Sequence, residues 1–313
     1  MIQVQNVQQQ PSQDVREQLY SQLEDYMGLS STKKKMDSSE KSGGTTLKRK
    51  SSEQSSSSSS SKALSKNTLA IKVNGKTIKG SAQNIVGRVV EAEMGASFRE
   101  EALKAQAVAA YTYIRYNNQK GTIPSLPAKS SVSAKVEDAV EQVIGEALYY
   151  QGEYINATYC ASNAGNSVDS ENVWGGYLPY LRSVESPGDT TLKAYGAVKR
   201  FSEEEIAQYI EENLDVDPYD YSDPDEWFED EEYINGRYVD SIRVCGKRLS
   251  GREAREELME FALPSAAFEV EYDDGEFIFT TYGYGHGVGM SQQGADYFAQ
   301  RGWDYEEILT HYY

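Results

Sequence analysis

The sequence predicts an α+β fold, because helical and strand patterns follow one another without the regular strand–helix–strand alternation of parallel-sheet proteins. Across residues 103–114, small and apolar side chains recur on one face of a helix. Residues 69–73 alternate between apolar and polar and run into the turn dipeptide Asn74-Gly75, a pattern typical of a β-hairpin. We therefore expect one globular α+β domain over residues 67–313.

Residues 1–66 differ in composition from the rest of the chain. They contain a serine tract at 55–61 and carry 10 basic and 7 acidic side chains, with few apolar residues between them. Such a segment cannot bury enough apolar surface to offset its chain entropy, so we expect a disordered linker or stalk. The one exception is a short amphipathic helix over 15–29, which the spacing of its apolar residues predicts.

The remaining elements follow from caps, turn dipeptides and apolar spacing. In the first half of the domain they are a helix over 85–93 capped by Asn84, a second helix opened by a capping box of Ser97 and Glu100, a third helix from Ser133, and a tyrosine-rich hairpin over 147–160 that turns at Gln151-Gly152. In the second half they are a helix over 202–213 with Ser202 as cap and Glu205 at the box position, strands over 241–244 and 268–281, a helix over 250–261 capped by Ser250, and a helix over 291–301. Their irregular order supports the α+β class.

The charge is strongly negative, with a net value of −18, and 15 acidic side chains lie within residues 203–232 without a single Lys or Arg. Such a surface repels phosphates, which argues against nucleic acid as a partner. A Ca²⁺ site around Asp215, Asp217 and Asp220 would lack the twelve-residue loop pattern with its central glycine. A solvated charged face is therefore favoured.

No hydrophobic run reaches the length of a membrane span, and no apolar signal core follows Met1. We therefore expect a chain that is either cytoplasmic or begins downstream of a targeting segment. Cys160 and Cys245 are too few for a disulfide scaffold, and their spacing leaves open whether they pair. With His286 and His311 they form no pattern of metal-site spacing, so neither a metal nor another cofactor is predicted.

Glu93 is the carboxylate that stands out. On a helix over 85–93 it falls inside the stripe of Val86, Val89 and Val90 rather than on the opposite face. A carboxyl group among valines is poorly solvated, and desolvation raises its pKa. A raised pKa is what a general acid near neutral pH requires. The alternative is that Glu93 ends the helix and turns to solvent or pairs with a lysine.

Residues 283–294 hold five glycines in twelve positions, together with His286, one of two histidines in the chain. Glycine loses more backbone entropy on folding than any other residue, so this run indicates positive φ angles or the close approach of a partner. The alternative is a tight strand-to-helix connection with a structural histidine.

Several ordered motifs resemble the stage II sporulation protein D family, which includes the amidase enhancers of bacterial cell-wall hydrolases. The motifs are Glu93-Met94-Gly95 with 96–98, 101–110, 172–176 with 180–184, 249–253, 263–268, the glycine-histidine segment, and 308–313. Together they cover roughly residues 69 to 313, which is the whole segment expected to fold. The resemblance implies a single α+β domain that could divide into two lobes around a glycan cleft.

The sporulation members of this family are lytic transglycosylases that act on peptidoglycan glycan strands. The resemblance places their catalytic acid on Glu93, the residue that the helical stripe also singles out. Glu93 would protonate the glycosidic oxygen between N-acetylmuramic acid and N-acetylglucosamine, and the muramic C6 hydroxyl would close a 1,6-anhydro ring without a metal or cofactor. The substrate-binding residues implied are Lys104, Gln106, Tyr111, Ser162, Asn163, His286, Ser291 and Gln292.

Two departures from the family pattern leave an alternative open. Gly95 replaces the usual proline after Glu-Met, and Tyr111 replaces an arginine, so Tyr111 would have to stack on a sugar ring instead. The alternative is a non-catalytic amidase enhancer that binds cell wall or an amidase. A third hypothesis, beside the transglycosylase and the amidase enhancer, is a metal-dependent hydrolase that uses His286 and the two cysteines.

The resemblance also implies partners and a location. The partners are peptidoglycan glycan strands stripped of stem peptides, a cell-wall amidase and a septal membrane complex. The location is extracytoplasmic, at the cell envelope, with a membrane anchor in an N-terminal segment missing from this chain.

Overall fold

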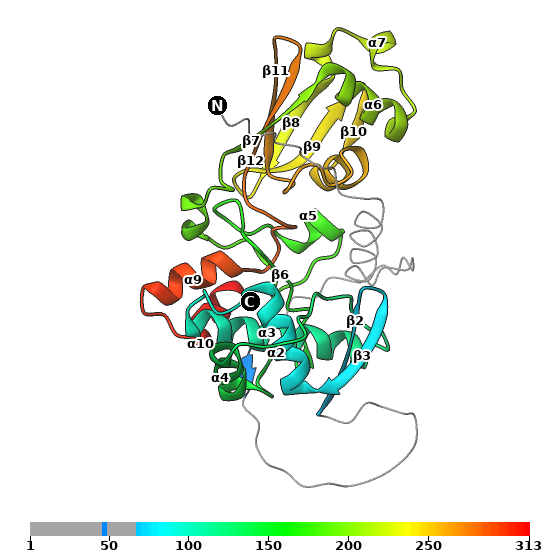
Figure 1. The fold of residues 1–313 in the computed structure, drawn as a ribbon. Coiled ribbons are helices and arrows are strands. Elements are labelled where there is room, and N and C mark those ends of the chain that lie inside the picture. The colour runs from blue at the N-terminus through cyan, green and yellow to red at the C-terminus, as the bar shows by residue number, and fades with distance from the viewer. Residues whose placement is uncertain (1–45, 49–66) are drawn as a thin grey trace, which may run out of the picture.

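The computed structural model describes residues 46–48 and 67–313 (Figure 1). Helices and strands alternate irregularly in it, which confirms the α+β class. The helix predicted over 15–29 lies outside the described residues. Within the segment predicted to be a linker, β1 (Thr46–Lys48) pairs antiparallel with β4 (Ala147–Tyr150).

One end of the molecule is built around helices. The predicted hairpin is formed by β2 (Thr68–Val73) and β3 (Lys76–Ser81), with Asn74 and Gly75 at positive φ in the turn. It is followed by α2 (Ala82–Glu93), α3 (Glu100–Gln119) and α4 (Ala134–Val143). Between residues 102 and 115, α3 is buried on every side, so it forms the centre of the larger hydrophobic cluster.

Two predicted helix starts are wrong, the first for a local reason and the second for a tertiary one. Ser81 rather than Asn84 caps α2, so this helix begins three residues earlier than expected. The capping box of Ser97 and Glu100 does not form. Instead α3 begins after Arg99, whose backbone N–H and guanidinium both bind the carboxylate of Asp296, from a distant helix.

The middle of the molecule is assembled from segments far apart in the chain. The predicted hairpin over 147–160 is shorter than expected: β4 and β5 (Glu153–Tyr154) form it, whereas β6 (Tyr159–Cys160) pairs in parallel with β13 (Met290–Ser291). The elements around this pairing are α5 (Ser170–Trp174), η1 (Pro187–Thr191), α9 (Gln292–Gln300) and α10 (Tyr305–Tyr312). The C-terminal helices thereby pack on α3.

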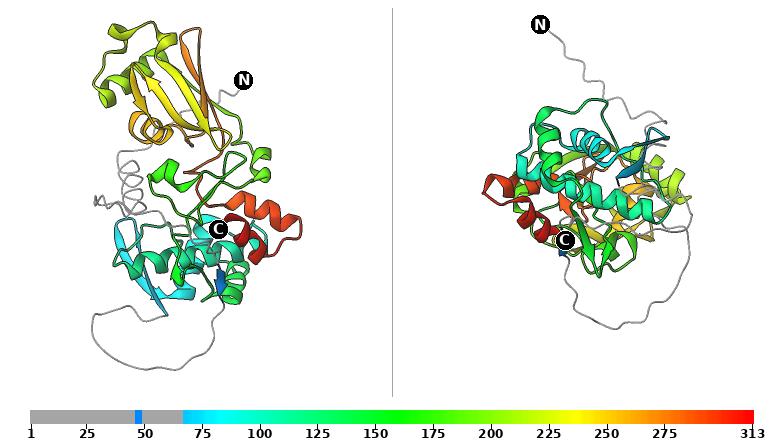
Figure 2. Two further views of the ribbon diagram at one scale, coloured as in Figure 1. Left: turned by 180° about the vertical axis from the view of Figure 1, so that it is seen from behind. Right: turned by 90° about the horizontal axis from the view of Figure 1, so that it is seen from below.

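The opposite end of the molecule carries two three-stranded antiparallel sheets, ordered β10-β9-β8 and β11-β12-β7 (Figures 1 and 2). The elements there are β7 (Ala197–Ser202), α6 (Glu203–Leu214), α7 (Pro218–Tyr221), η2 (Pro224–Glu226), β8 (Phe228–Ile234), β9 (Tyr238–Val244), β10 (Lys247–Leu249), α8 (Gly251–Glu253), η3 (Ala254–Leu258), β11 (Phe268–Asp273) and β12 (Glu276–Thr281). The capping box at Ser202 and the cap at Ser250 form as predicted, and Ser250 makes a full capping box with Glu253. The helix expected over 250–261 is shorter and continues as one π-helical turn, η3.

The acidic segment 203–232 is not only a charged face, because it supplies part of a second hydrophobic cluster. Ile206 and Ile210 of α6 and Trp227 lie fully buried in that cluster. The structure thus contains one domain with two clusters of buried apolar side chains. The division into two lobes around a glycan cleft stays a prediction.

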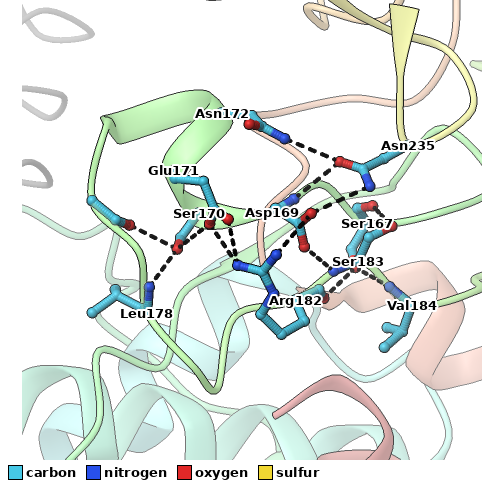
Figure 3. A network of polar contacts seen from close by, with 11 residues as sticks. Ser167, Asp169, Ser170, Glu171, Asn172, Leu178, Arg182, Ser183, Val184 and Asn235 are labelled. Carbon is cyan, nitrogen blue, oxygen red and sulfur yellow. Dashed lines mark hydrogen bonds and ion pairs between the residues drawn. The ribbon is translucent and has the colours of Figure 1, made fainter. Parts of the chain in front are cut away.

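A polar network joins the turn between β8 and β9 to the loop over 169–184 (Figure 3). Arg182 pairs with Asp169 at 3.0 Å and with Glu171 at 2.6 Å. Asn235, at the tip of the β8–β9 turn, accepts from the backbone N–H of Asp169 at 3.4 Å and from the side-chain amide of Asn172 at 3.3 Å. The network therefore ties the sheet end of the molecule to the middle segment that contains α5 (Figure 1).

We expect Arg182→Lys to lower the free energy of unfolding by about 1 kcal/mol, because a lysine cannot bind two carboxylates with one planar fork. Urea unfolding measures this change. Arg243→Lys is the control, since Arg243 makes one exposed pair, with Asp230 at 2.8 Å. Equal effects of the two substitutions would show that the network around Arg182 adds nothing beyond a surface ion pair.

Candidate functional site

Glu93 is the last residue of α2, and the helix places its carboxyl group at the edge of the larger cluster. Val86, Val89 and Val90 are all fully buried, so the apolar stripe predicted for this helix is confirmed. Burial raises the pKa of Glu93 above its ordinary value of 4.5, and a hydrogen bond from Gln292 opposes the rise in part. The Nε2 atom of Gln292 lies 3.0 Å from Oε2 of Glu93.

The glycine-histidine segment brings Gln292 to this position. Gly287 and Gly289 have φ of 78° and 76°, which side chains other than glycine rarely adopt. A Cβ atom at Gly289 would stand 2.3 Å from the carbonyl oxygen of Thr158, and one at Gly287 would stand 2.2 Å from the hydroxyl of Tyr238. The glycines therefore allow the backbone of this segment to pack closely against Thr158 and Tyr238 of the same chain.

A buried carboxylate, Asp189 of η1, binds both the segment that contains Asn163 and the segment that contains Ser291. Its Oδ2 atom accepts from the backbone N–H of Asn163 at 2.9 Å, and its Oδ1 atom accepts from the hydroxyl of Ser291 at 2.8 Å. Asn163 in turn accepts from the thiol of Cys160, with Sγ and Oδ1 3.0 Å apart. Burial raises the pKa of Asp189 to about 6, against the hydrogen bonds that it accepts.

Most of the predicted substrate-binding residues are buried, with less than a tenth of their surface exposed. These are Lys104, Gln106, Tyr111, Ser162, Asn163, Ser291 and Gln292. In the unbound protein such side chains can act on a substrate only through a neighbour that reaches solvent. Their substrate-binding roles stay predictions, and the contacts that they make are structural.

Three of these residues lie along α3. Lys104 pairs with Glu100 at 2.9 Å and Glu101 at 2.8 Å, which ties its charge to its own helix. Tyr111 lies under Arg115, whose Nε donates to the tyrosine hydroxyl at 3.0 Å. Because Tyr111 is 6 % exposed, its ring cannot stack on a sugar in this conformation.

Gln106 is fully buried beside the hydroxyl of Tyr159, and neither atom of its amide has a partner at normal hydrogen-bond distance among the described residues. The pKa of Tyr159 is raised well above its ordinary value, mainly by burial and next by the nearby charge of Glu93. Tyr159, Gln106 and Gln292 thus form a group of buried polar side chains near the carboxyl of Glu93.

His286 contacts a different set of residues. Its ring lies 5.2 Å from that of Trp174, its Nδ1 atom accepts from the backbone N–H of Val288 at 3.0 Å, and it makes a further hydrogen bond with the backbone of Tyr159. Burial and the neighbouring Arg255 lower the pKa of His286 to about 3, so the imidazole is neutral at physiological pH. These contacts favour the structural role for His286 that the sequence left open.

Asp189, Tyr159 and Arg255 belong to the site's surroundings but were missed from the sequence. Asp189 follows Pro187-Gly188, a turn signal in which an acidic residue is ordinary. Tyr159 is one of several tyrosines in its segment. No local pattern distinguishes either residue, because their roles depend on contacts with residues far away in the sequence, such as Ser291 for Asp189 and Glu93 for Tyr159.

Among residues 46–48 and 67–313, no group of three or more His, Cys, Asp or Glu side chains is arranged to hold a metal ion. Cys160 and Cys245 are both free and buried. In the same part of the chain, no helix combines the length and apolar character needed to cross a membrane.

The raised pKa of Glu93 predicts that folding stability depends on pH. Between its ordinary value of 4.5 and the higher value in the folded protein, Glu93 holds a proton that the unfolded chain releases. Stability from this group is therefore fully present at low pH and is lost as pH rises through the folded pKa. Compared with Glu93→Gln in urea unfolding from about pH 4 to about pH 8, the wild type should lose stability relative to the variant as pH rises. If the difference in unfolding free energy between the wild type and Glu93→Gln stays constant over this pH range, the raised pKa is contradicted.

Comparison with known proteins identifies the family of this chain. A family model described as "Stage II sporulation protein" matches residues 77–150, which include Glu93 and all of α3. Stage II sporulation protein D of Bacillus amyloliquefaciens is 33 % identical over 269 residues, covering 76 % of this chain and 75 % of that protein. The corresponding protein of Bacillus subtilis is 32 % identical, with 76 % of each chain covered. A protein named "Amidase enhancer" from Bacillus subtilis is 27 % identical over 72 % of this chain and 39 % of its own length. The chain therefore belongs to the stage II sporulation protein D family.

Proposed function

We propose that this protein is a lytic transglycosylase that cleaves the bonds between N-acetylmuramic acid and N-acetylglucosamine in peptidoglycan glycan strands. The observation that carries the proposal is the carboxyl group of Glu93, which follows the buried valines of α2, has a pKa raised by desolvation and accepts one hydrogen bond from Gln292. A carboxyl group in this environment keeps its proton to a higher pH than an ordinary glutamate does, and it can deliver that proton to a leaving group.

The reaction proposed needs one carboxyl group and balances without water. Glu93 donates its proton to the glycosidic oxygen as the bond from that oxygen to C1 of the muramic residue breaks. The C6 hydroxyl of the same residue then forms a bond to C1, and its proton passes to the carboxylate of Glu93. The product ends in a 1,6-anhydro ring, and Glu93 is protonated again. Ordinary glycosidases use a second carboxylate, whereas here the nucleophile belongs to the substrate.

Gln292 has a defined part in this scheme. Its N–H donates to Oε2 of Glu93 and so supports the carboxylate that forms after proton transfer. The same donor restrains the direction in which the carboxyl group points, and orientation contributes strongly to the rate of such a transfer.

The partners and location proposed follow from the substrate. Peptidoglycan lies outside the cytoplasm, so the protein would act at the cell envelope, on strands from which an amidase has removed the stem peptides. Attachment to the membrane and association with a septal membrane complex during sporulation belong to the same proposal.

The test uses the full chain and purified glycan strands with and without stem peptides. Mass spectrometry of the products should reveal new 1,6-anhydro-muramic ends, formed faster on the stripped strands and equally well in the presence of EDTA. Absence of anhydro ends on both substrates would reject the transglycosylase.

The second candidate function is that of a non-catalytic amidase enhancer. It is favoured by the similarity to the protein named "Amidase enhancer" and by Gly95 and Tyr111, where the chain departs from the family pattern. A protein of this kind would produce no anhydro ends, but it would increase the release of stem peptides when added to an amidase. Measuring both products in one incubation separates the two functions.

A further inference from the structure

Glu93 is connected to Asp189 through two residues at the start of α9. Ser291 is the N-cap of that helix, and Gln292 is its first residue. Ser291 donates its hydroxyl proton to Asp189 at 2.8 Å and accepts from the backbone N–H of Gly294 at 2.9 Å. Gln292 then reaches Glu93 at 3.0 Å.

The contacts of Ser291 leave its hydroxyl a single orientation. Its one proton is directed at Asp189, and its oxygen is occupied by the first turn of α9. Asp189 and Ser291 are 1 % and 0 % exposed, so water does not compete for either group. The direction of the first turn of α9, and with it the position of the Gln292 side chain, is therefore set by where Asp189 stands.

Asp189 is itself held from three directions. Pro187–Thr191 forms a short 3₁₀ helix, and a Cβ atom at Gly188 would stand 2.4 Å from the Tyr297 side chain, so η1 packs directly on α9. The second oxygen of Asp189 accepts the backbone N–H of Asn163. Titratable side chains that face this carboxylate are Cys160, Tyr238 and Tyr312.

We infer that Asp189 is a positioning residue for Glu93: acting through Ser291, it holds Gln292 at hydrogen-bond distance from the acid without touching it. An ionised carboxylate offers both of its oxygens as acceptors, one to the Ser291 hydroxyl and one to the backbone N–H of Asn163. An asparagine at 189 would turn an N–H toward one of these two donors, and the start of α9 would shift. The catalytic consequence rests on the proposed function, whereas the effect on the titration of Glu93 does not.

The experiment measures the pKa of Glu93 directly, by carbon NMR of protein labelled at the glutamate carboxyl, with Glu93→Gln identifying the signal. Loss of the Gln292 hydrogen bond should raise this pKa, since the bond favours the charged form. Gln292→Leu should therefore raise it by roughly 0.5 to 1, and Asp189→Asn by a similar amount. The double variant should show no more than the shift of Gln292→Leu, because both changes remove the same contact.

Two further variants keep the result interpretable. Ser291→Ala removes the link but leaves Asp189 in place, and it should reproduce the shift even if Asp189→Asn folds poorly. Asp169→Asn is the matched control, since Asp169 accepts from the backbone N–H of Ser183 at 2.7 Å and pairs with Arg182 but contacts no part of α9. It should leave the pKa of Glu93 unchanged.

A Glu93 titration that stays at its wild-type pKa in Asp189→Asn and Ser291→Ala would overturn the inference, as would shifts that simply add in the double variant. In the cleavage assay, the alkaline limb of the pH profile should move upward by the same amount as the titration. If the wild type cleaves no glycan while the titration responds as expected, the proposed function fails and the positioning role stands.

Discussion

Glu93→Gln should reduce the formation of anhydro-muramic ends by about 10²- to 10⁴-fold, the usual contribution of a general acid. Glutamine has the shape of glutamate but no proton of suitable acidity to give to the glycosidic oxygen. Its side-chain oxygen can still accept from Gln292, so the fold and the binding of glycan should persist. The rate of end formation on stripped glycan strands, followed by mass spectrometry, measures the loss.

The same helix supplies a matched control for this substitution. Glu91, two residues earlier, accepts from the hydroxyl of Ser133 at 2.7 Å and from its backbone N–H at 3.1 Å. The Ser133 hydroxyl is the main reason that its pKa is lowered, so Glu91 is ionised near neutrality and cannot act as an acid. Glu91→Gln should retain cleavage. Comparable losses in the two variants would mean that a negative end of α2, rather than the acidity of Glu93, matters for activity.

Gly289→Ala in the glycine-histidine segment should be strongly destabilising, costing roughly 3 to 5 kcal/mol. The added carbon would meet the carbonyl oxygen of Thr158, which accepts from both the Met290 backbone and the Tyr313 hydroxyl. To relieve that clash, β13 must separate from β6. Gln292 follows β13 directly in the chain, so its side chain would move as well. Urea unfolding should show the loss of stability, and glycan cleavage should fall with it.

Gly275→Ala separates this clash from backbone strain. Gly275 has a φ of 84°, close to the 76° of Gly289, but a Cβ there meets nothing within 4 Å. Gly275→Ala should therefore lower the free energy of unfolding by only about 1 to 2 kcal/mol, because alanine is strained in a left-handed backbone conformation. Similar losses at the two positions would show that packing against Thr158 is unimportant.

Features that depend on neighbouring residues could be predicted from the sequence. The boxes at Ser202 and Ser250 form because each side chain has its partner three residues away. Glu93 could be singled out because helical periodicity alone places it among valines that prove to be buried.

Features that depend on distant residues could not be predicted in this way. The capping box at Ser97 has the correct local pattern, but Asp296 occupies the start of α3 instead. Trp227 lies fully buried although acidic residues surround it in sequence, because its ring stacks on Phe277 of the distant strand β12. Tyr111 aligns with a family position that suggests a ligand contact, yet the side chain of Arg115 covers it.

The two free cysteines provide separate reporters of local opening in this protein. Cys160 lies in β6 beside Asn163, whereas Cys245 belongs to the second hydrophobic cluster and donates its backbone N–H to Trp227. Burial raises their thiol pKa values to about 12 and about 11, so neither forms the reactive thiolate while the protein is closed. Alkylation of each thiol in native buffer therefore follows the opening of its own surroundings, and the ratio of the two rates ranks the stability of the region around β6 against that of the sheet end.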